Sequence, residues 1–182
     1  MNYAGIIGNN ARNSTNRTLL QYIQKHFGGS DQITLCEIKD VPFFNKPASH
    51  VAPPEVAKIA AAIEQADGVI IATPEYDHTV PAVLSNTLEW LAYTTDVLKD
   101  KPVFIVGASY GALGTSRAQG HLRIMLNGPD LGARVLPGQE YLLGHSLQAF
   151  DEDGMLVEAE DIQSLEDHMK YFAEFVKSNQ GK

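Results

Sequence analysis

The sequence has little cysteine, little positive charge and no long apolar run. Cys36 is its only cysteine, so no internal disulfide can form, and the apolar run 33–38 around it indicates a buried strand thiol rather than a reactive one. Lys and Arg number 14 against 22 Asp and Glu, and the resulting net charge of −8 opposes binding to nucleic acids and to anionic membranes. No stretch is apolar for long enough to span a bilayer, and residues 1–3 lack the basic start of a secretory signal. A cytoplasmic location is therefore expected.

Metal-binding spacing is also missing. The six histidines show neither H-x-H nor H-E-x-x-H spacing, so no metal site is predicted.

What the sequence does have is a globular composition, with 44% hydrophobic and 20% charged residues. A length of 182 residues fits one domain of ordinary size, so a single domain over residues 1–182 is expected.

Short β-rich runs alternate with helical periodicity along the whole chain. Strands are expected at five places, and helical patterns separate and follow them. The runs 68–72 and 102–106 are apolar without alternation, as in central parallel strands that are covered on both faces. The pattern predicts an α/β fold, a doubly wound five-stranded parallel sheet with the flavodoxin-like order 2-1-3-4-5. The expected strands are 3–8, 32–38, 68–73, 103–108 and, more weakly, 133–136.

The loop after the first strand has the composition of a phosphate site. In open parallel sheets ligands bind at the carboxyl ends of the strands where the strand order reverses, which here means the loops after strands one, three and four. The first loop runs straight into a helix and carries Arg12, Ser14 and Asn16. Free N–H groups at a helix start favour an anion, and hydroxyl, amide and guanidinium groups add donors. Ser14 as an ordinary helix cap is the alternative, but a cap needs one such residue rather than a run of them.

The loops after strands three and four differ in character. Tyr76 offers an aromatic surface where a planar ligand would lie, while Thr79 is expected to cap the following helix with Pro81 in its first turn. The loop after strand four, residues 107–114, holds three glycines that let the backbone approach a ligand closely.

Together the three loops resemble the NADPH-dependent FMN reductase family, which includes quinone, azo-dye and chromate reductases. The resemblance extends from the first strand through the fourth helix. It is carried by Gly8-x-x-x-Arg12-x-Ser14-x-Asn16, then by Thr73-Pro-Glu-Tyr76 with Pro81, Leu84, Asn86 and Trp90 downstream, then by Gly107-Ala-Ser109-x-Gly111-x-x-Gly114-x-x-Arg117-Ala-Gln119-x-His121-Leu-Arg123.

This resemblance implies an FMN cofactor, NADPH or NADH as the electron donor, and a quinone, azo compound or similar small molecule as the acceptor. The implied reaction is ping-pong hydride transfer with the chemistry on the flavin and no protein catalytic residue, in a homodimer or homotetramer. The implied phosphate ligands are Arg12, Ser14 and Asn16; the isoalloxazine ring would be lined by Pro74, Glu75, Tyr76 and Asp77, and its other edge by Ser109, Tyr110 and Gly111.

Three positions depart from the pattern usual in that family. Ser usually follows the first Gly and the Arg stands one position earlier, so Arg12 reaches the phosphate differently or Asn9 takes over. An Asn usually follows the Tyr, whereas an ionised Asp77 can only accept hydrogen bonds. Ala82 stands where Gly is usual.

Two other functions fit parts of the sequence. Residues 107–111 satisfy G-x-S-x-G, which allows a Ser hydrolase that uses Ser109 with Asp151 or Asp153 and His168. The hydrolase elbow should enter its helix directly, however, and residues 112–114 prolong the loop. A non-enzymic electron carrier of the flavodoxin type is the second alternative, although the first loop lacks the Thr-rich pattern of flavodoxins.

Overall fold

The computed structural model describes residues 1–138 and 140–179, and its strands form one parallel sheet in the order β2-β1-β3-β4-β5, with β6 also paired to β4. The strands are β1 (Asn2–Ile7), β2 (Gln32–Glu37), β3 (Gly68–Ala72), β4 (Pro102–Ala108), β5 (Arg134–Val135) and β6 (Tyr141–Leu143). The helices are α1 (Thr15–Phe27), α2 (Pro54–Gln65), α3 (Ala82–Thr94), α4 (Ser116–Asn127) and α5 (Ala159–Asn179).

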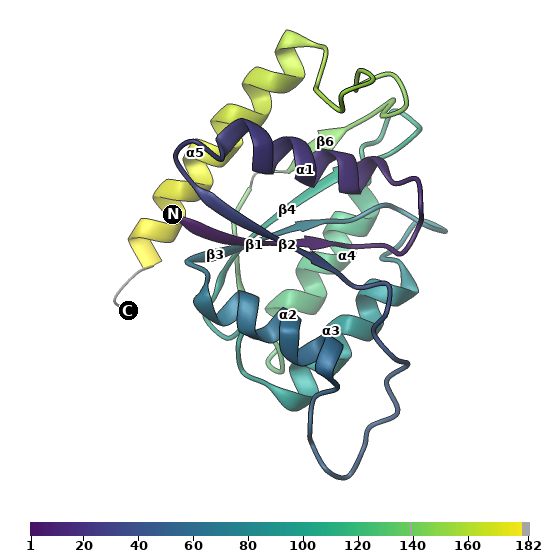
Figure 1. Cartoon of the computed structure of the whole chain (residues 1–182), viewed down its shortest axis with the longest axis vertical. Coiled ribbons are helices and arrows are strands. Elements are labelled where there is room, and N and C mark those ends of the chain that lie inside the picture. Colours follow the sequence, from purple (N-terminus) through teal and green to yellow (C-terminus); the bar gives the residue numbers. More distant parts are fainter. Residues whose placement is uncertain (139, 180–182) are drawn as a thin grey trace.

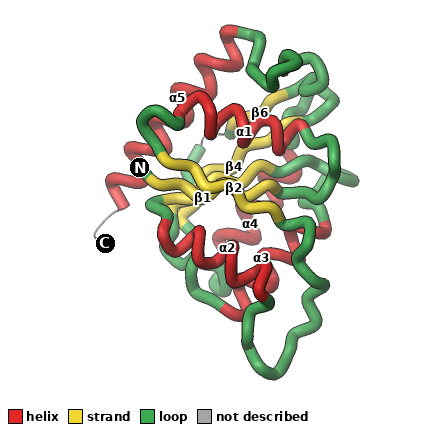
Figure 2. The backbone as a smooth tube through the Cα atoms, viewed as in Figure 1, coloured by secondary structure: helices red, strands yellow, loops and turns green. Residues whose placement is uncertain are grey.

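Helices cover both faces of the sheet. Helices α1 and α5 lie on one face and α2, α3 and α4 on the other, so the sheet is the middle of three layers (Figure 1). Each face has its own apolar core, and all five residues of β3 and all seven of β4 are buried. The N-terminus and the C-terminal end of α5 lie at the opposite end of the sheet from the loop that joins β1 to α1, and loops connect the layers at both ends of the strands (Figure 2). The predicted doubly wound fold and its strand order are confirmed.

The fifth sheet position differs from the prediction because two short segments fill it. β5 pairs with Pro102 and Val103, and β6 pairs with the far end of β4 at Val106 to Ala108. Between them, Pro137 has no N–H to continue the ladder, and Gly138 adopts a positive φ of 68°. A three-residue strand such as β6 is too short to show a sequence period, so the sequence does not predict it.

The start of α3 also differs from the prediction. Pro81 is the N-cap and the helix begins at Ala82, so the expected capping by Thr79 is wrong. Thr79 instead pairs with Tyr76 in a short antiparallel bridge, and its hydroxyl is hydrogen-bonded to His121 Nδ1 at 2.8 Å.

Among the described residues, no helix combines the length and apolarity needed to cross a membrane.

Candidate functional site

A cavity of about 690 Å³ opens at the carboxyl ends of β1, β3 and β4. This volume is in the range of pockets that hold small ligands. All the predicted site residues except Arg12 line it, and residues that were not predicted join them. The lining comprises Asn9, Ala11, Asn13, Ser14, Thr15 and Asn16 from the first loop, Pro74 to His78 from the second, and Ala108 to Leu113, Thr115 and Arg117 from the third.

The first loop presents neutral donors at the start of α1. Ser14 is the N-cap, and its Oγ accepts hydrogen bonds from Arg17 N–H at 3.1 Å and from Asn9 Nδ2 at 2.7 Å. Because Oγ is already an acceptor twice, the Ser14 hydroxyl proton remains available to a ligand. The backbone N–H groups of Thr15 and Asn16, in the first turn of α1, have no acceptor within the described parts of the chain. Ser14 therefore caps the helix and also keeps a hydroxyl donor. Its roles as a helix cap and as a phosphate ligand are compatible.

Neither Arg12 nor Arg17 lines the cavity. Arg12 is exposed and does not line the cavity. Arg17 pairs with Glu37 at 2.7 Å and also donates to the carbonyl of Ala11. The geometry thus supports an anion site built from helix N–H and hydroxyl groups, without the guanidinium that the sequence suggested.

The side chains of two predicted ligands are hydrogen-bonded to other parts of the protein. The Asn16 amide is buried and exchanges two hydrogen bonds with the backbone of Ala108, at 2.8 and 2.9 Å, which ties α1 to the end of β4. Ser109 donates its N–H to the carbonyl of Leu143 and its hydroxyl to the carbonyl of Gly111. The backbone N–H of Asn16 remains for a ligand, and the N–H groups of Tyr110 and Gly111 likewise have no acceptor among the described residues.

The second loop forms a tight hairpin. Tyr76 and Thr79 exchange backbone hydrogen bonds at 3.2 and 3.0 Å, and the two residues between them, Asp77 and His78, have φ values of 48° and 63°. Two positive φ values define a type I′ turn, which favours Asn-Gly or Asp-Gly, so His78 is strained there. The hairpin carries the second wall of the cavity.

Glu75 does not point its carboxylate into open space. Its Oε2 accepts from the N–H groups of Arg117 and Ala118 at 3.0 and 3.2 Å, and its Oε1 accepts from the Arg117 guanidinium at 3.0 Å. Burial alone would raise the pKa of Glu75, but these hydrogen bonds outweigh burial and hold the pKa below its ordinary value. A carboxylate in this position caps the N-terminus of α4.

Exposed aromatic and aliphatic surface surrounds the cavity. Tyr76, Tyr110 and Leu113 line it and remain 47%, 60% and 52% exposed. Large apolar side chains that stay open at one cavity mark a ligand or partner site.

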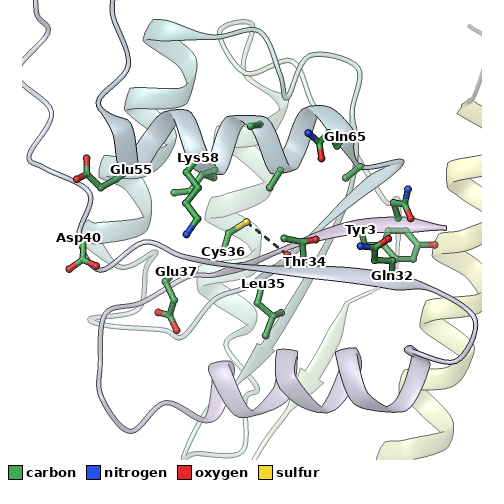
Figure 3. Close-up of a pocket in the computed structure, with 15 residues that line it drawn as sticks. Tyr3, Gln32, Thr34, Leu35, Cys36, Glu37, Asp40, Glu55, Lys58 and Gln65 are labelled. Atoms are coloured by element: carbon green, nitrogen blue, oxygen red, sulfur yellow. Dashed lines mark hydrogen bonds between the residues drawn. The ribbon is translucent and has the colours of Figure 1, made fainter.

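A second cavity, of about 460 Å³, lies between α2 and the edge strand β2 (Figure 3). None of its lining comes from the loops after β1, β3 or β4. Cys36 on its wall is 7% exposed, and burial raises the pKa of this thiol to about 11. The predicted burial of this thiol in a strand is confirmed. Within the described chain no group of His, Cys, Asp or Glu residues could hold a metal ion.

The first cavity fits a planar mononucleotide. Helix N–H groups and hydroxyls suit a phosphate at one end, and two loops with free N–H groups and tyrosine rings suit a polar aromatic ring at the other. His78 and Arg117 belong to this lining but were not predicted, because their positions depend on tertiary folding. The fold and the cavity thus define a doubly wound α/β protein with a ligand-sized cavity at the carboxyl ends of its strands.

Comparison with known proteins specifies the class further. Residues 1–148 match the family described as NADPH-dependent FMN reductase. The chain is 50% identical over 177 residues to the "NADH:(hydroxy)cinnamate reductase subunit CrdA" of Vibrio ruber, which covers 97% of this chain and 88% of that protein. It is 40% identical over 185 residues to the "NADH-dependent flavin reductase subunit 2" of Lactobacillus johnsonii, covering 99% and 100%. Among solved structures, the NAD(P)H:(acceptor) oxidoreductase FerB of Paracoccus denitrificans matches with a TM-score of 0.87 at 25% identity, covering 98% of each chain.

The chain belongs to the NADPH-dependent FMN reductase family. It is accordingly an oxidoreductase that uses FMN with NAD(P)H as the electron donor.

The hydrolase alternative fails on the geometry as well. The Ser109 hydroxyl bonds to Gly111, and His168 lies on α5 with Nδ1 bonded to the carbonyl of Ser164.

Proposed function

We propose that this protein takes electrons from NAD(P)H and passes them to a small-molecule acceptor at one open face of the cavity, in a ping-pong sequence. When bound, FMN supplies the redox chemistry, accepting a hydride from the donor and delivering it to the acceptor. The observation that carries this proposal is the single cavity in which the loops after β1, β3 and β4 meet. A shared face means that the oxidised donor leaves before the acceptor enters.

The polypeptide contributes binding and electrostatics. Ser14 and the N–H groups of Thr15 and Asn16 hold the phosphate at the positive end of α1. The N–H groups of Tyr110 and Gly111, which have no acceptor among the described residues, would be donors for negative charge on the edge of a bound, reduced ring. No side chain is assigned as an acid or base.

The acceptor belongs to the class of planar, conjugated molecules. Tyr76, Tyr110 and Leu113 give the mouth of the cavity an apolar, aromatic rim that suits quinones, azo compounds or a second flavin. Relatives named as reductases of hydroxycinnamate, flavin and quinone act on molecules of this shape. We further infer that the protein is cytoplasmic and assembles with other chains, as a homodimer or homotetramer.

Steady-state kinetics test the proposal. With NADH or NADPH and a quinone varied together, a shared face predicts parallel lines in double-reciprocal plots. Converging lines would require both substrates bound at once and would contradict the ping-pong sequence. Titration with FMN and FAD tests the cofactor, because a cavity with one phosphate site should prefer FMN.

A further inference from the structure

Two independent ties join the Tyr76–Thr79 hairpin to α4. At its start, Glu75 accepts three hydrogen bonds from Arg117 and Ala118. At its end, the Thr79 hydroxyl bonds to His121, one turn further along the same helix. The hairpin and α4 are about 40 residues apart in the sequence, so neither tie is a local turn contact.

The N-terminus of α4 depends on Glu75. Its own N-cap, Thr115, has a positive φ of 70° and makes no side-chain capping bond. A helix start without a cap leaves backbone N–H groups without partners, and a carboxylate is the best acceptor for them. Glu75, whose side chain is only 11% exposed, takes that place from another loop.

We propose that Glu75 is a positioning residue for the flavin site: it clamps the hairpin to the N-terminus of α4 and thereby fixes two walls of the cavity relative to each other. This inference rests on the proposed FMN site. Both carboxylate oxygens already accept hydrogen bonds from α4, so the role inferred for Glu75 is to hold the cavity walls in place. What it holds is the strained Asp77-His78 turn, whose N–H groups have no acceptor among the described residues. A strained turn at a binding site keeps its geometry only when its surroundings enforce it.

Substitutions that separate the two halves of the clamp test this role. Glu75→Ala removes both the two hydrogen bonds from backbone N–H groups and the ion pair with the Arg117 guanidinium. Arg117→Met removes only the ion pair and keeps the N–H of residue 117. The double variant Glu75→Gln with Arg117→Met keeps an amide oxygen for the two backbone N–H groups. We expect FMN dissociation constants about tenfold above wild type for Glu75→Ala and within about threefold for the double variant. Wild-type affinity in Glu75→Ala, or no rescue in the double variant, would overturn the clamp.

A matched control comes from Asp151, which lies outside the cavity and also accepts two backbone N–H groups, at 3.0 and 2.8 Å. Asp151→Ala should lower thermal stability without changing the affinity for FMN. If both alanine variants weaken FMN binding equally, general damage explains the loss and the positioning role is wrong.

Hydrogen exchange on the protein without FMN gives a readout that is independent of the cofactor. Glu75→Ala should speed exchange at the amides of residues 79 and 117–118, while Asp151→Ala should not. Unchanged exchange would overturn the clamp even if FMN binding fell, because a carboxylate that touched the cofactor directly would act only in the complex. If wild-type protein bound no FMN, the proposed function would fail, and the exchange result would still decide whether the clamp exists.

Discussion

Ser14 and Arg12 sit two residues apart, yet the structure gives them different places. Ser14 lines the cavity, and its hydroxyl donates to no group among the described residues, whereas Arg12 is exposed and lies outside the cavity lining. A hydrogen bond to a charged group contributes roughly 1.5–3 kcal/mol, so Ser14→Ala should weaken FMN binding by about 10- to 100-fold. Arg12→Ala is the matched control, with an expected change of less than about threefold.

Fluorescence titration with FMN and with riboflavin, which lacks the phosphate, checks the Ser14 prediction. Ser14→Ala should leave riboflavin affinity close to wild type. A large loss of FMN affinity in Arg12→Ala would instead restore the guanidinium to the phosphate site.

The Cys36 thiol gives a second prediction at this scale. A pKa of about 11 leaves on the order of one thiolate in a thousand at pH 8, and the side chain is also buried. Labelling by a thiol-specific disulfide reagent should therefore be slow in the native protein and fast in urea. Rapid native labelling at pH 8 would show that the β2–α2 cavity opens to solvent.

Among the elements, the Asp77-His78 turn stores measurable strain. A side chain at φ 63° costs about 1 kcal/mol relative to glycine, and the contact of His78 with Glu75 at 3.6 Å is exposed and contributes little. We expect His78→Gly to raise the free energy of unfolding by roughly 0.5–1 kcal/mol in the protein without FMN. Gly138→Ala is the reverse control, because its φ is 68° and the space around it is open, so only backbone strain acts. Equal stability of His78→Gly and wild type in urea unfolding would contradict the strain.

The clamp between the hairpin and α4 should respond to pH. The folded-state pKa of Glu75 is lowered, so its stabilisation is complete above the pKa of the unfolded chain and is lost as pH falls through the folded value. The unfolding free energy of wild type should therefore decline more steeply from pH 6 to about pH 3 than that of Glu75→Gln. Parallel declines in the two proteins would show that Glu75 does not stabilise the fold through its charge.

The same elements show what a sequence can predict. Apolar runs such as Val69–Ala72 predicted the central strands because burial on both faces leaves a continuous pattern. Strand order and the three ligand loops followed from that pattern. The donors of the first loop were identified by type, but the hydrogen bonds of Asn16 to Ala108 depend on packing between α1 and β4, and the exposure of Arg12 has no signal in the sequence. The family resemblance placed Glu75 at the ring, whereas its bonds to α4 involve residues about 40 positions away and carry no local signal.

For the whole molecule, the net charge of −8 and the phosphate site have opposite effects on an anionic cofactor. A phosphate monoester carries about −1.5 to −2 charges at pH 7 and is repelled at long range by the acidic protein. In the proposed site, helix N–H groups and hydroxyls bind the phosphate. The nearby arginines are paired with carboxylates, Arg17 with Glu37 and Arg117 with Glu75. Salt shortens the screening length from roughly 30 Å at 0.01 M to about 10 Å at 0.1 M, which weakens the repulsion more than the short contacts.

We therefore expect the affinity for FMN to stay constant or rise as NaCl increases from about 0.01 to 0.2 M. Riboflavin, which is neutral, should show no such rise and is the matched control for effects of salt on the fold. An affinity for FMN that falls steeply with salt would mean that a cation holds the phosphate. Repeating the titration with Arg12→Ala and Arg117→Met would then identify it, since loss of that cation would abolish the salt dependence.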